Sequence, residues 1–482
     1  MEEQSGEKPE LIAKIAKYLP SVQKPLYKQG FNERLKWTGI ALLLYLVMSY
    51  ITVYGLAPTS YEQFRFFEIV LGSRFGSIMT LGIGPIVTAG IILQLLVGSK
   101  IINWDMSKPE SKKRFQSWNK VLAIAFSFIE ATAYVLAGAV PVAGDFTIFL
   151  MVILQLAAGG VLVILLDEIV SKWGFGSGVS LFIAAGVGSQ ILVRAFSPLT
   201  ATCAVLQFGT CFPSEGSPPT GLFWNSLLNL LGGKFIEATV NFIPLLATVL
   251  IFFLVIYIQA IKVEVPLAFS ALRGFGRSWA LKLLYTSNIP VILTAALLAN
   301  VQLMGRVGVA PTPEGLNCGF MGCFDKQGTP INGLVYFLSA PRNLLIDFVT
   351  SALTPKEVFR ALTYTAFLVI GAVIFSVFWV NTAGMDAKSI AEQIEGVGMQ
   401  IPGYRRDPRI VESVLNRYIP PLSVLGGLTV GLLAALGDSL GTIGTGTGIL
   451  LTVMIVYNYY EELSNQPLED AHPFIRKLLG GE

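Results

Sequence analysis

Residues 147–166 read TIFLMVILQLAAGGVLVILL, a run without a single charged side chain. An α-helix needs about 20 predominantly apolar residues to cross the hydrocarbon core of a bilayer. The run therefore predicts a membrane-spanning helix. The whole chain agrees with this prediction, because 53% of its 482 residues are hydrophobic, only 13% are charged and the mean hydropathy is +0.64. Such a composition is too apolar for a soluble domain.

Similar apolar runs precede and follow this one, and together they predict ten spanning helices, which places both termini on one side of the membrane. Most of the 34 Lys and Arg residues fall in the N-terminal tail, in alternate loops and in the C-terminal tail. The positive-inside rule therefore predicts that both termini are cytoplasmic. The predicted spans are 35–55, 76–98, 121–141, 147–166, 177–196, 239–261, 287–304, 358–380, 420–436 and 442–460.

Ten spans divide naturally into five and five, an arrangement that suits two repeats of opposite topology, although the two halves share no repeat visible by eye. Residues 9–19 place apolar side chains on one helical face and predict an interfacial helix. No cleavable signal peptide is expected in the first 36 residues. The predicted organisation is a cytoplasmic tail over 1–36, a first half over 37–196, an outer loop over 197–238, a second half over 239–460 and a cytoplasmic tail over 461–482.

The composition disfavours several classes of function. The net charge of +3 is too small to indicate a nucleic-acid binder. One histidine and four cysteines, with no CxxC pair, leave little material for a metal, haem or iron–sulfur centre. No HExxH pattern supplies a zinc site. We expect no cofactor, no metal and no enzymatic activity.

Glu130 is the only acid that falls in the middle of a predicted span. A charge at the centre of a bilayer costs at least about 2.5–3.5 kcal/mol on insertion scales, so such a residue is a candidate functional residue. A protonated or hydrogen-bonded structural glutamate explains it equally well. Asp167, Glu168, Arg194 and Asp438 lie near the ends of spans, so no charged relay crosses the membrane. This distribution argues against an ion-coupled pump.

Four motifs carry a resemblance to a known family: TLGIGPIVTAGIILQLL at 80–96, GFGSGVSLFIAAG at 174–186, TSNIPVIL at 286–293 and NRYIPPLSVLGG at 416–427. They resemble SecY, the large subunit of the protein-conducting channel (the Sec translocon), in its archaeal and eukaryotic branch. The resemblance implies an all-α polytopic membrane protein with ten transmembrane helices in two inverted five-helix halves. It also implies a clamshell around an hourglass pore, a short outer plug helix and a gate that opens sideways to lipid.

The resemblance further implies a ring of apolar side chains that closes the pore. Branched side chains at such a constriction resist wetting and ions. The i, i+4 spacing of Ile83 with Val87, and of Val179 with Ile183, places each pair on one helical face. Without the family match, ordinary core or lipid-facing residues would be the better explanation. The implied ring residues are Ile83 and Val87 in the second span, Val179 and Ile183 in the fifth, Ile292 in the seventh and Leu433, assigned to the tenth.

The family places its plug between the first two spans, here at 57–75. This segment is too polar to span a membrane, and Phe64, Phe67 and Leu71 fall at helical spacing within it. Arg74 follows, and the acid expected to pair with it near the end of the eighth span is replaced by Asn381, which puts that ion pair in doubt.

A polar cluster at the family's lateral gate corresponds to Thr88, Glu130 and Asn300. These neighbours could hydrogen-bond a neutral Glu130 carboxyl.

Basic residues gather in the cytoplasmic loops 262–285 and 381–418. They could follow the positive-inside rule or contact anionic lipid. The family uses the corresponding loops to dock ribosomes, and exposed arginines suit phosphate contacts to RNA. The implied docking residues are Arg273, Arg277, Lys282, Arg405 and Arg406.

All four cysteines fall in outer loops, on the side where disulfides persist. The short spacing within each pair predicts two local bonds, Cys203 to Cys211 and Cys318 to Cys323. Free thiols and a four-cysteine zinc site are the alternatives.

We therefore expect the central pore-forming subunit of a protein translocation channel in the cell membrane, with an archaeal plasma membrane as the favoured location. It would pass unfolded polypeptides across the membrane and release hydrophobic segments sideways into lipid. The expected partners are SecE-type and beta small membrane subunits, the ribosome, nascent polypeptides that bear signal sequences, and membrane lipid. A secondary transporter for a small molecule is the alternative, but it should offer a polar midplane pocket rather than an apolar constriction.

Overall fold

A computed structural model describes the chain over residues 19–464. The description omits residues 28, 58–75, 100, 103, 105, 107, 201–212, 214–217, 270–275, 287, 307–308, 312–315, 326–328, 342–343, 350–352, 397–398 and 401–407.

Five helices of the first half coincide with the first five predicted spans. Three of them, α2, α5 and α6, extend beyond the apolar runs that predicted them. The first-half helices are α2 (Phe31–Ser49), α4 (Gly84–Gly98), α5 (Pro109–Leu136), α6 (Phe146–Trp173) and α7 (Gly178–Phe196).

Five helices of the second half coincide with the remaining predicted spans. The longest, α15, begins twelve residues before the predicted boundary and carries Pro420 and Pro421 inside it. The second-half helices are α9 (Phe235–Gln259), α10 (Ile289–Met304), α13 (Pro355–Thr382), α15 (Pro408–Ser439) and α16 (Gly446–Ser464).

Two of these helices, α4 and α10, are shorter than the others. In the second span the helix starts only at Gly84, because residues 77–83 form turns and Pro85 occupies the first turn of the helix. Pro290 does the same in α10. Proline fits the first helical turn, where its missing N–H has no partner to lose. Among the described residues, six helices are long and apolar enough by themselves to cross a membrane, and α4 and α10 are apolar but shorter.

Two small sheets lie outside the helical bundle, and the hydropathy pattern did not predict them. In one, β1 (Lys262–Phe269) pairs antiparallel with β2 (Gly276–Lys282) and with β7 (Met399–Gln400). In the other, four strands follow the order β3-β4-β5-β6. Its strands are β3 (Ala310–Pro311), β4 (Asn317–Gly319), β5 (Gly322–Phe324) and β6 (Pro330–Gly333), and the remaining short helices are α8 (Leu222–Leu231), α11 (Leu334–Phe337), α12 (Leu344–Val349) and α14 (Ala387–Gly396).

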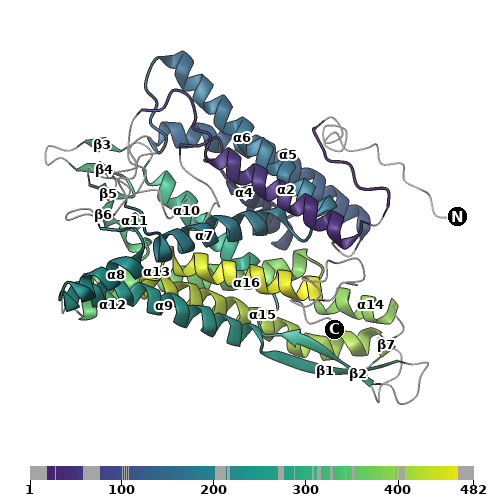
Figure 1. The fold of residues 1–482 in the computed structure, drawn as a ribbon. Coiled ribbons are helices and arrows are strands. Elements are labelled where there is room, and N and C mark those ends of the chain that lie inside the picture. The colour runs from purple at the N-terminus through teal and green to yellow at the C-terminus, as the bar shows by residue number, and fades with distance from the viewer. Residues whose placement is uncertain are drawn as a thin grey trace.

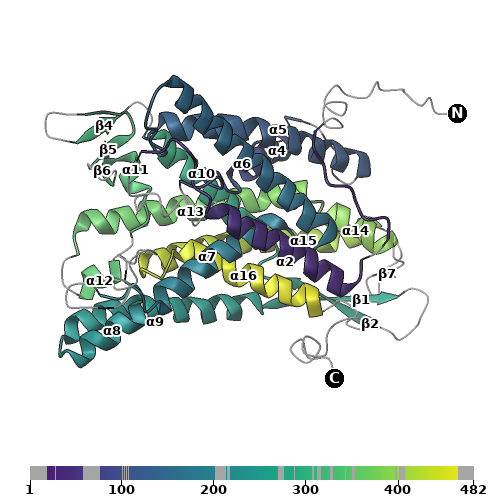
Figure 2. The ribbon, with the colours of Figure 1, turned by 45° about the horizontal axis from the view of Figure 1, so that its top comes forward.

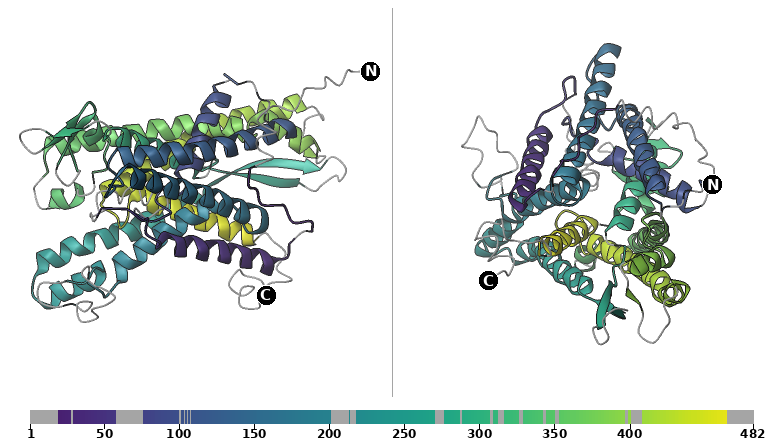
Figure 3. Two further views of the ribbon diagram at one scale, coloured as in Figure 1. Left: turned by 90° about the horizontal axis from the view of Figure 1, so that it is seen from above. Right: turned by 90° about the vertical axis from the view of Figure 1, so that its right-hand side faces the viewer.

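The two halves occupy different sides of the bundle (Figure 1). Helices α2, α4, α5 and α6 lie together, helices α9, α13, α15 and α16 lie together, and Figure 3 shows the same separation along the helix axes. The start of α2, the end of α16 and the β1–β2 hairpin lie at one end of the bundle, and β3–β6 lie at the other (Figures 1 and 2). This arrangement agrees with the predicted placement of the connecting loops on two opposite faces.

Within each half, helices approach so closely that glycine is required. A Cβ added to Gly159 on α6 would lie 1.9 Å from the backbone oxygen of Ile78, in the turns that precede α4. In the second half, a Cβ on Gly427 of α15 would lie 2.8 Å from the oxygen of Ala372 on α13. Small residues of this kind let membrane helices pack backbone against backbone.

The predicted bond between Cys318 and Cys323 is present, with the two residues directly opposite each other in the β4–β5 hairpin and their Cα atoms 4.1 Å apart. This bond removes the free-thiol and zinc alternatives for this pair. Cys203 and Cys211 lie outside the described residues, so their pairing stays a prediction.

We expect Cys318→Ser to destabilise the β4–β5 hairpin locally, because closing so short a loop stabilises it by about 2 kcal/mol in the loop-closure model. Hydrogen exchange at Asn317–Gly319 and Gly322–Phe324 should accelerate, whereas exchange in α13 should not change. Equal exchange in the hairpins of the variant and the parent chain would contradict this prediction.

Candidate functional site

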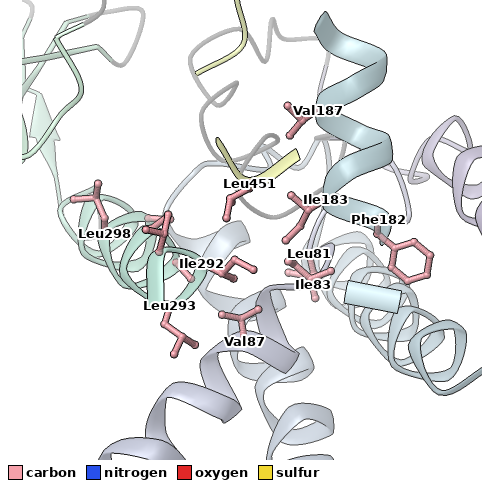
Figure 4. Close-up of a cluster of buried hydrophobic side chains, with 14 of the residues drawn as sticks. Leu81, Ile83, Val87, Phe182, Ile183, Val187, Ile292, Leu293, Leu298 and Leu451 are labelled. Atoms are coloured by element: carbon pink, nitrogen blue, oxygen red, sulfur yellow. The ribbon is translucent and has the colours of Figure 1, made fainter. Parts of the chain in front are cut away.

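Four helices each place a large apolar side chain from their first two turns at one point in the bundle (Figure 4). Ile83 precedes the first residue of α4, and Val87 lies in the first turn of that helix. Ile183 belongs to α7, Ile292 to α10 and Leu451 to α16. None of these five side chains is more than 6% exposed. They form the constriction cluster, defined here as Ile83, Val87, Ile183, Ile292 and Leu451.

The helix starts at the constriction cluster repeat between the halves. Val87 follows Pro85 by two residues, and Ile292 follows Pro290 by two residues. These residues belong to the second helix of each half, so they are equivalent in an inverted repeat.

The fifth helices of the two halves repeat in the same way. Ile183 comes five residues after Gly178 of the triplet 176–178, GSG, and Leu451 comes five residues after Gly446 of the triplet 444–446, GTG. The first glycine of each triplet has a positive φ, 60° at Gly176 and 89° at Gly444. Both halves therefore contribute equivalent side chains to the constriction cluster.

A polar cluster lies beside the constriction cluster, where α4 and α5 of the first half meet α10 of the second. The Thr88 hydroxyl donates to Glu130 Oε1 at 2.6 Å, and Asn300 Nδ2 donates to Thr88 Oγ1 at 3.3 Å. Glu130 is 7% exposed, and its Oε2 has no hydrogen-bond partner among the described residues. The three residues named from the sequence are thus together, and Thr88 directly follows Val87.

Two family models cover almost all of the described chain. The model described as SecY matches residues 77–460, and the model described as the plug domain of Sec61p matches residues 43–76. The chain belongs to the SecY family. The predicted fold and the predicted role as a channel subunit are therefore confirmed, and the small-molecule transporter alternative is not supported.

Individual SecY relatives match over nearly their whole length. Protein translocase subunit SecY of Pyrococcus furiosus is 43% identical, over 98% of this chain and 99% of the relative. The same subunit of Methanothermobacter thermautotrophicus is 44% identical, over 96% of this chain and 97% of the relative.

Solved SecY-family structures agree with the fold. A structure described as a protein conducting channel is 40% identical, covers 96% of this chain and 99% of its own, and superposes with a TM-score of 0.78. Sec61 in the canine ribosome–channel complex from the endoplasmic reticulum has the same identity and coverage and a TM-score of 0.75.

The assignment of Leu433 to the tenth span of the SecY pattern was wrong. Leu433 belongs to α15, the ninth spanning helix, where it is 3% exposed in the apolar core. The tenth spanning helix is α16, and its Leu451 lies at the constriction cluster (Figure 4). The match of GLLAALGDS was too loose to fix the residue, whereas the GSG and GTG triplets would have found Leu451. Val179 is partly buried and packs against the same core.

The structure does not test the plug residues or the partner expected for Arg74. Phe64, Phe67, Leu71 and Arg74 of the plug segment lie outside the described residues, and Asn381 is an exposed residue of α13. Their proposed contacts therefore stay predictions.

Among the five docking residues, Arg273, Arg405 and Arg406 also lie outside the described residues. Arg277 is described only in its backbone, which pairs with Leu267 across the β1–β2 hairpin. Lys282 forms an ion pair with Glu461 of α16, and its Nζ lies 5.8 Å from the Tyr457 ring centroid. Lys282 therefore also ties the hairpin to the last helix.

The loop before α10 is fixed from the same end of the bundle. The Tyr285 hydroxyl donates to the Met385 oxygen at 2.8 Å, and burial raises the pKa of Tyr285 to about 12. This hydrogen bond therefore persists at every physiological pH. Among the described residues, no group of three or more His, Cys, Asp or Glu side chains could hold a metal ion.

We expect Thr88→Val to lower stability and to weaken the contact between the halves, because it keeps the side-chain shape but removes the Thr88–Glu130 bond within the first half and the Asn300–Thr88 bond between the halves. Interhelical hydrogen bonds in membranes contribute about 0.6 kcal/mol each, so the loss should be about 1 kcal/mol. Unfolding of the purified protein in detergent measures it. Thr132→Val is the control, since the Thr132 hydroxyl bonds only the Phe128 oxygen of its own helix. Equal losses of stability in Thr88→Val and Thr132→Val would show that the Thr88 hydrogen bonds do not strengthen the contact between the halves.

Proposed function

We propose that the constriction cluster is the seal of a protein-conducting channel, through which unfolded polypeptides cross the membrane. One observation carries the proposal: five apolar side chains from four helix starts, two in each half, converge at one place. A ring of branched side chains excludes water and ions when it is closed. The same ring yields to a passing chain without recognising its sequence, so the protein needs no chemistry or cofactor of its own.

We propose further that the contact between α4, α5 and α10 is the lateral gate, through which hydrophobic segments leave for the lipid. The polar cluster supports this role, because Thr88, bonded to Glu130 within the first half, accepts a hydrogen bond from Asn300 of the second half. Such bonds are weak in membranes, so the helices can separate at modest cost. Separation would expose Asn300 and Glu130 to lipid, which favours the closed state in the absence of a client.

The partners follow from the family membership. We propose that residues 57–75 form the plug, that the cytoplasmic loops dock ribosomes, and that SecE-type and beta small subunits complete the channel. The clients are nascent polypeptides with signal sequences. Both termini are proposed to be cytoplasmic in the cell membrane, which the common location of the start of α2 and the end of α16 supports (Figure 1). A ribosome-bound canine relative with the same fold supports the docking surface.

The seal is tested by making it polar. We expect Ile183→Ser and Leu451→Ser, each in the complete channel complex in lipid vesicles, to raise the resting ion leak by about tenfold or more, because hydroxyl groups let water enter a hydrophobic constriction. Leu433→Ser is the matched control: it replaces an equally buried leucine on α15 and should lower stability without raising the leak. A leak raised only by the Leu433 variant would overturn both the seal and the assignment of Leu451.

The gate is tested with client segments of graded hydrophobicity. We expect Asn300→Leu to lower the hydrophobicity that a segment needs to enter the lipid, because it removes a bond of the closed gate and the cost of exposing an amide in the open one. An interhelical hydrogen bond contributes about 0.5–1.7 kcal/mol, and each leucine favours insertion by about 0.6 kcal/mol. The threshold should therefore fall by about one to three leucine residues per segment.

Gln302→Leu is the control for this gate variant. Gln302 lies two residues further along α10 and donates to the Leu338 oxygen within the second half, at 3.0 Å. An insertion threshold that is unchanged for Asn300→Leu, or shifted equally by both variants, would count against the gate.

A further inference from the structure

The two helices that begin with a glycine triplet, α7 and α16, each start beside an acid of the preceding helix. Asp167 of α6 is partly buried, and its Oδ1 accepts the N–H of Val179 at 2.9 Å. Asp438 of α15 is 3% exposed, and its Oδ1 accepts the N–H of Gly446 at 2.8 Å. Both acids therefore bond the first turn of a helix that carries a constriction side chain.

Asp438 has two further partners, which tie three helices of the second half together. Its Oδ2 accepts the Thr447 hydroxyl at 2.8 Å and the Tyr364 hydroxyl at 2.8 Å. Thr447 is the second residue of α16, and Tyr364 is a fully buried residue of α13. The start of α16 is thereby fixed against both α13 and α15.

The fit between each acid and each helix start leaves no room for a side chain. A Cβ on Gly178 would lie 2.6 Å from the Asp167 Cα, and a Cβ on Gly446 would lie 2.2 Å from the Asp438 backbone nitrogen. The same arrangement of acid, glycine triplet and constriction residue thus occurs once in each half. It occurs between the fourth and fifth helices of the first half and between their counterparts in the second, as an inverted repeat requires.

Helix starts need partners of this kind, because the first N–H groups of a helix have no acceptor within it. In a membrane there is little water to replace the missing acceptor, and a carboxylate also interacts favourably with the positive end of the helix dipole. Ile183 and Leu451 lie five residues beyond the helix starts, about 8 Å along the axis. A displacement of the first turn therefore moves these side chains directly.

We propose that Asp167 and Asp438 are paired positioning residues of the channel, which hold the first turns of α7 and α16 so that Ile183 and Leu451 close the constriction. The inference rests on the proposed seal. It differs from a purely structural role because it concerns the leak of the closed channel: releasing either helix start loosens the constriction while both halves stay folded.

The test compares alanine and asparagine at each position, in the complete channel complex in lipid vesicles. We expect Asp167→Ala and Asp438→Ala to raise the resting ion leak about five- to thirtyfold, the effect of losing one helix-capping side chain on a local equilibrium. Asp167→Asn and Asp438→Asn keep an acceptor oxygen and should stay within about twofold of the parent. At Asp438 the hydroxyls of Tyr364 and Thr447 can accept from the new amide.

Two controls separate this effect from the loss of any polar side chain nearby. Glu168→Ala removes the neighbouring acid, which pairs with Lys120 and Lys172 instead of with α7. Thr442→Val removes a buried hydroxyl that bonds only the Gly437 oxygen, in the connection before α16. Neither variant should raise the leak.

The milder variants Tyr364→Phe and Thr447→Val each remove one donor from Asp438 and cover the case in which Asp438→Ala fails to assemble. Each should raise the leak by a smaller factor than the alanine variant. Leaks equal to the parent in both, or in assembled Asp167→Ala, would overturn the proposal. Ile183→Ser, measured alongside, distinguishes the causes: if it leaks while the aspartate variants do not, only the positioning role fails, and if it does not leak, the seal itself fails.

Discussion

The fold depends on one constraint, which is that a chain inside a membrane must supply acceptors for its own backbone N–H groups. A continuous helix meets this constraint along its length, but a constriction made from four helix starts leaves the first turn of each helix open. The structure closes these starts in two ways. At α4 and α10, a proline in the first turn removes one of the unpaired N–H groups. At α7 and α16, an aspartate carboxylate accepts an N–H of the first turn.

The contacts within the halves and between them are of different kinds. Inside the halves, α6 packs against the turn before α4 at Gly159, and α15 packs against α13 at Gly427 and Gly431, with no space for a Cβ. Between the halves, at the proposed gate, the polar contacts run through the side chains of Thr88, Glu130 and Asn300. Side-chain contacts can break and reform, whereas backbone-to-backbone packing cannot separate without losing the fold. This difference would let two stable halves move apart at the proposed gate.

Much of this could be predicted from the sequence, because hydropathy reports directly on lipid. All ten spans correspond to helices, and Thr88, Glu130 and Asn300 are in contact as expected. The helix starts could not be predicted, since apolar turns at 77–83 look the same as apolar helix to a hydropathy scale. The β1–β2 hairpin was not predicted, because a hydropathy scale detects spanning helices and the charged strands of this hairpin belong to a connecting loop. Leu451 was missed for a similar reason, because the repeat between the halves consists of a few turn-forming residues and not of a periodic pattern.

The three buried or partly buried acids near the pore, Asp438, Asp167 and Glu130, differ in how fully their carboxylates are hydrogen-bonded. Asp438 accepts three hydrogen bonds from two helices, so moving any partner away leaves a buried carboxylate with fewer donors, at a cost that rises in a low dielectric. Asp167 likewise bonds the first turn of its neighbour. Glu130 has one bonded oxygen and one without a partner among the described residues. Its bonded oxygen accepts from Thr88 of the same half, so opening the proposed gate between α4 and α10 breaks the Asn300–Thr88 bond and leaves the Thr88–Glu130 bond in place. The carboxylates that bond a neighbouring helix start, Asp438 and Asp167, lie at helix contacts that stay fixed. The carboxylate with one unbonded oxygen, Glu130, lies at the proposed gate.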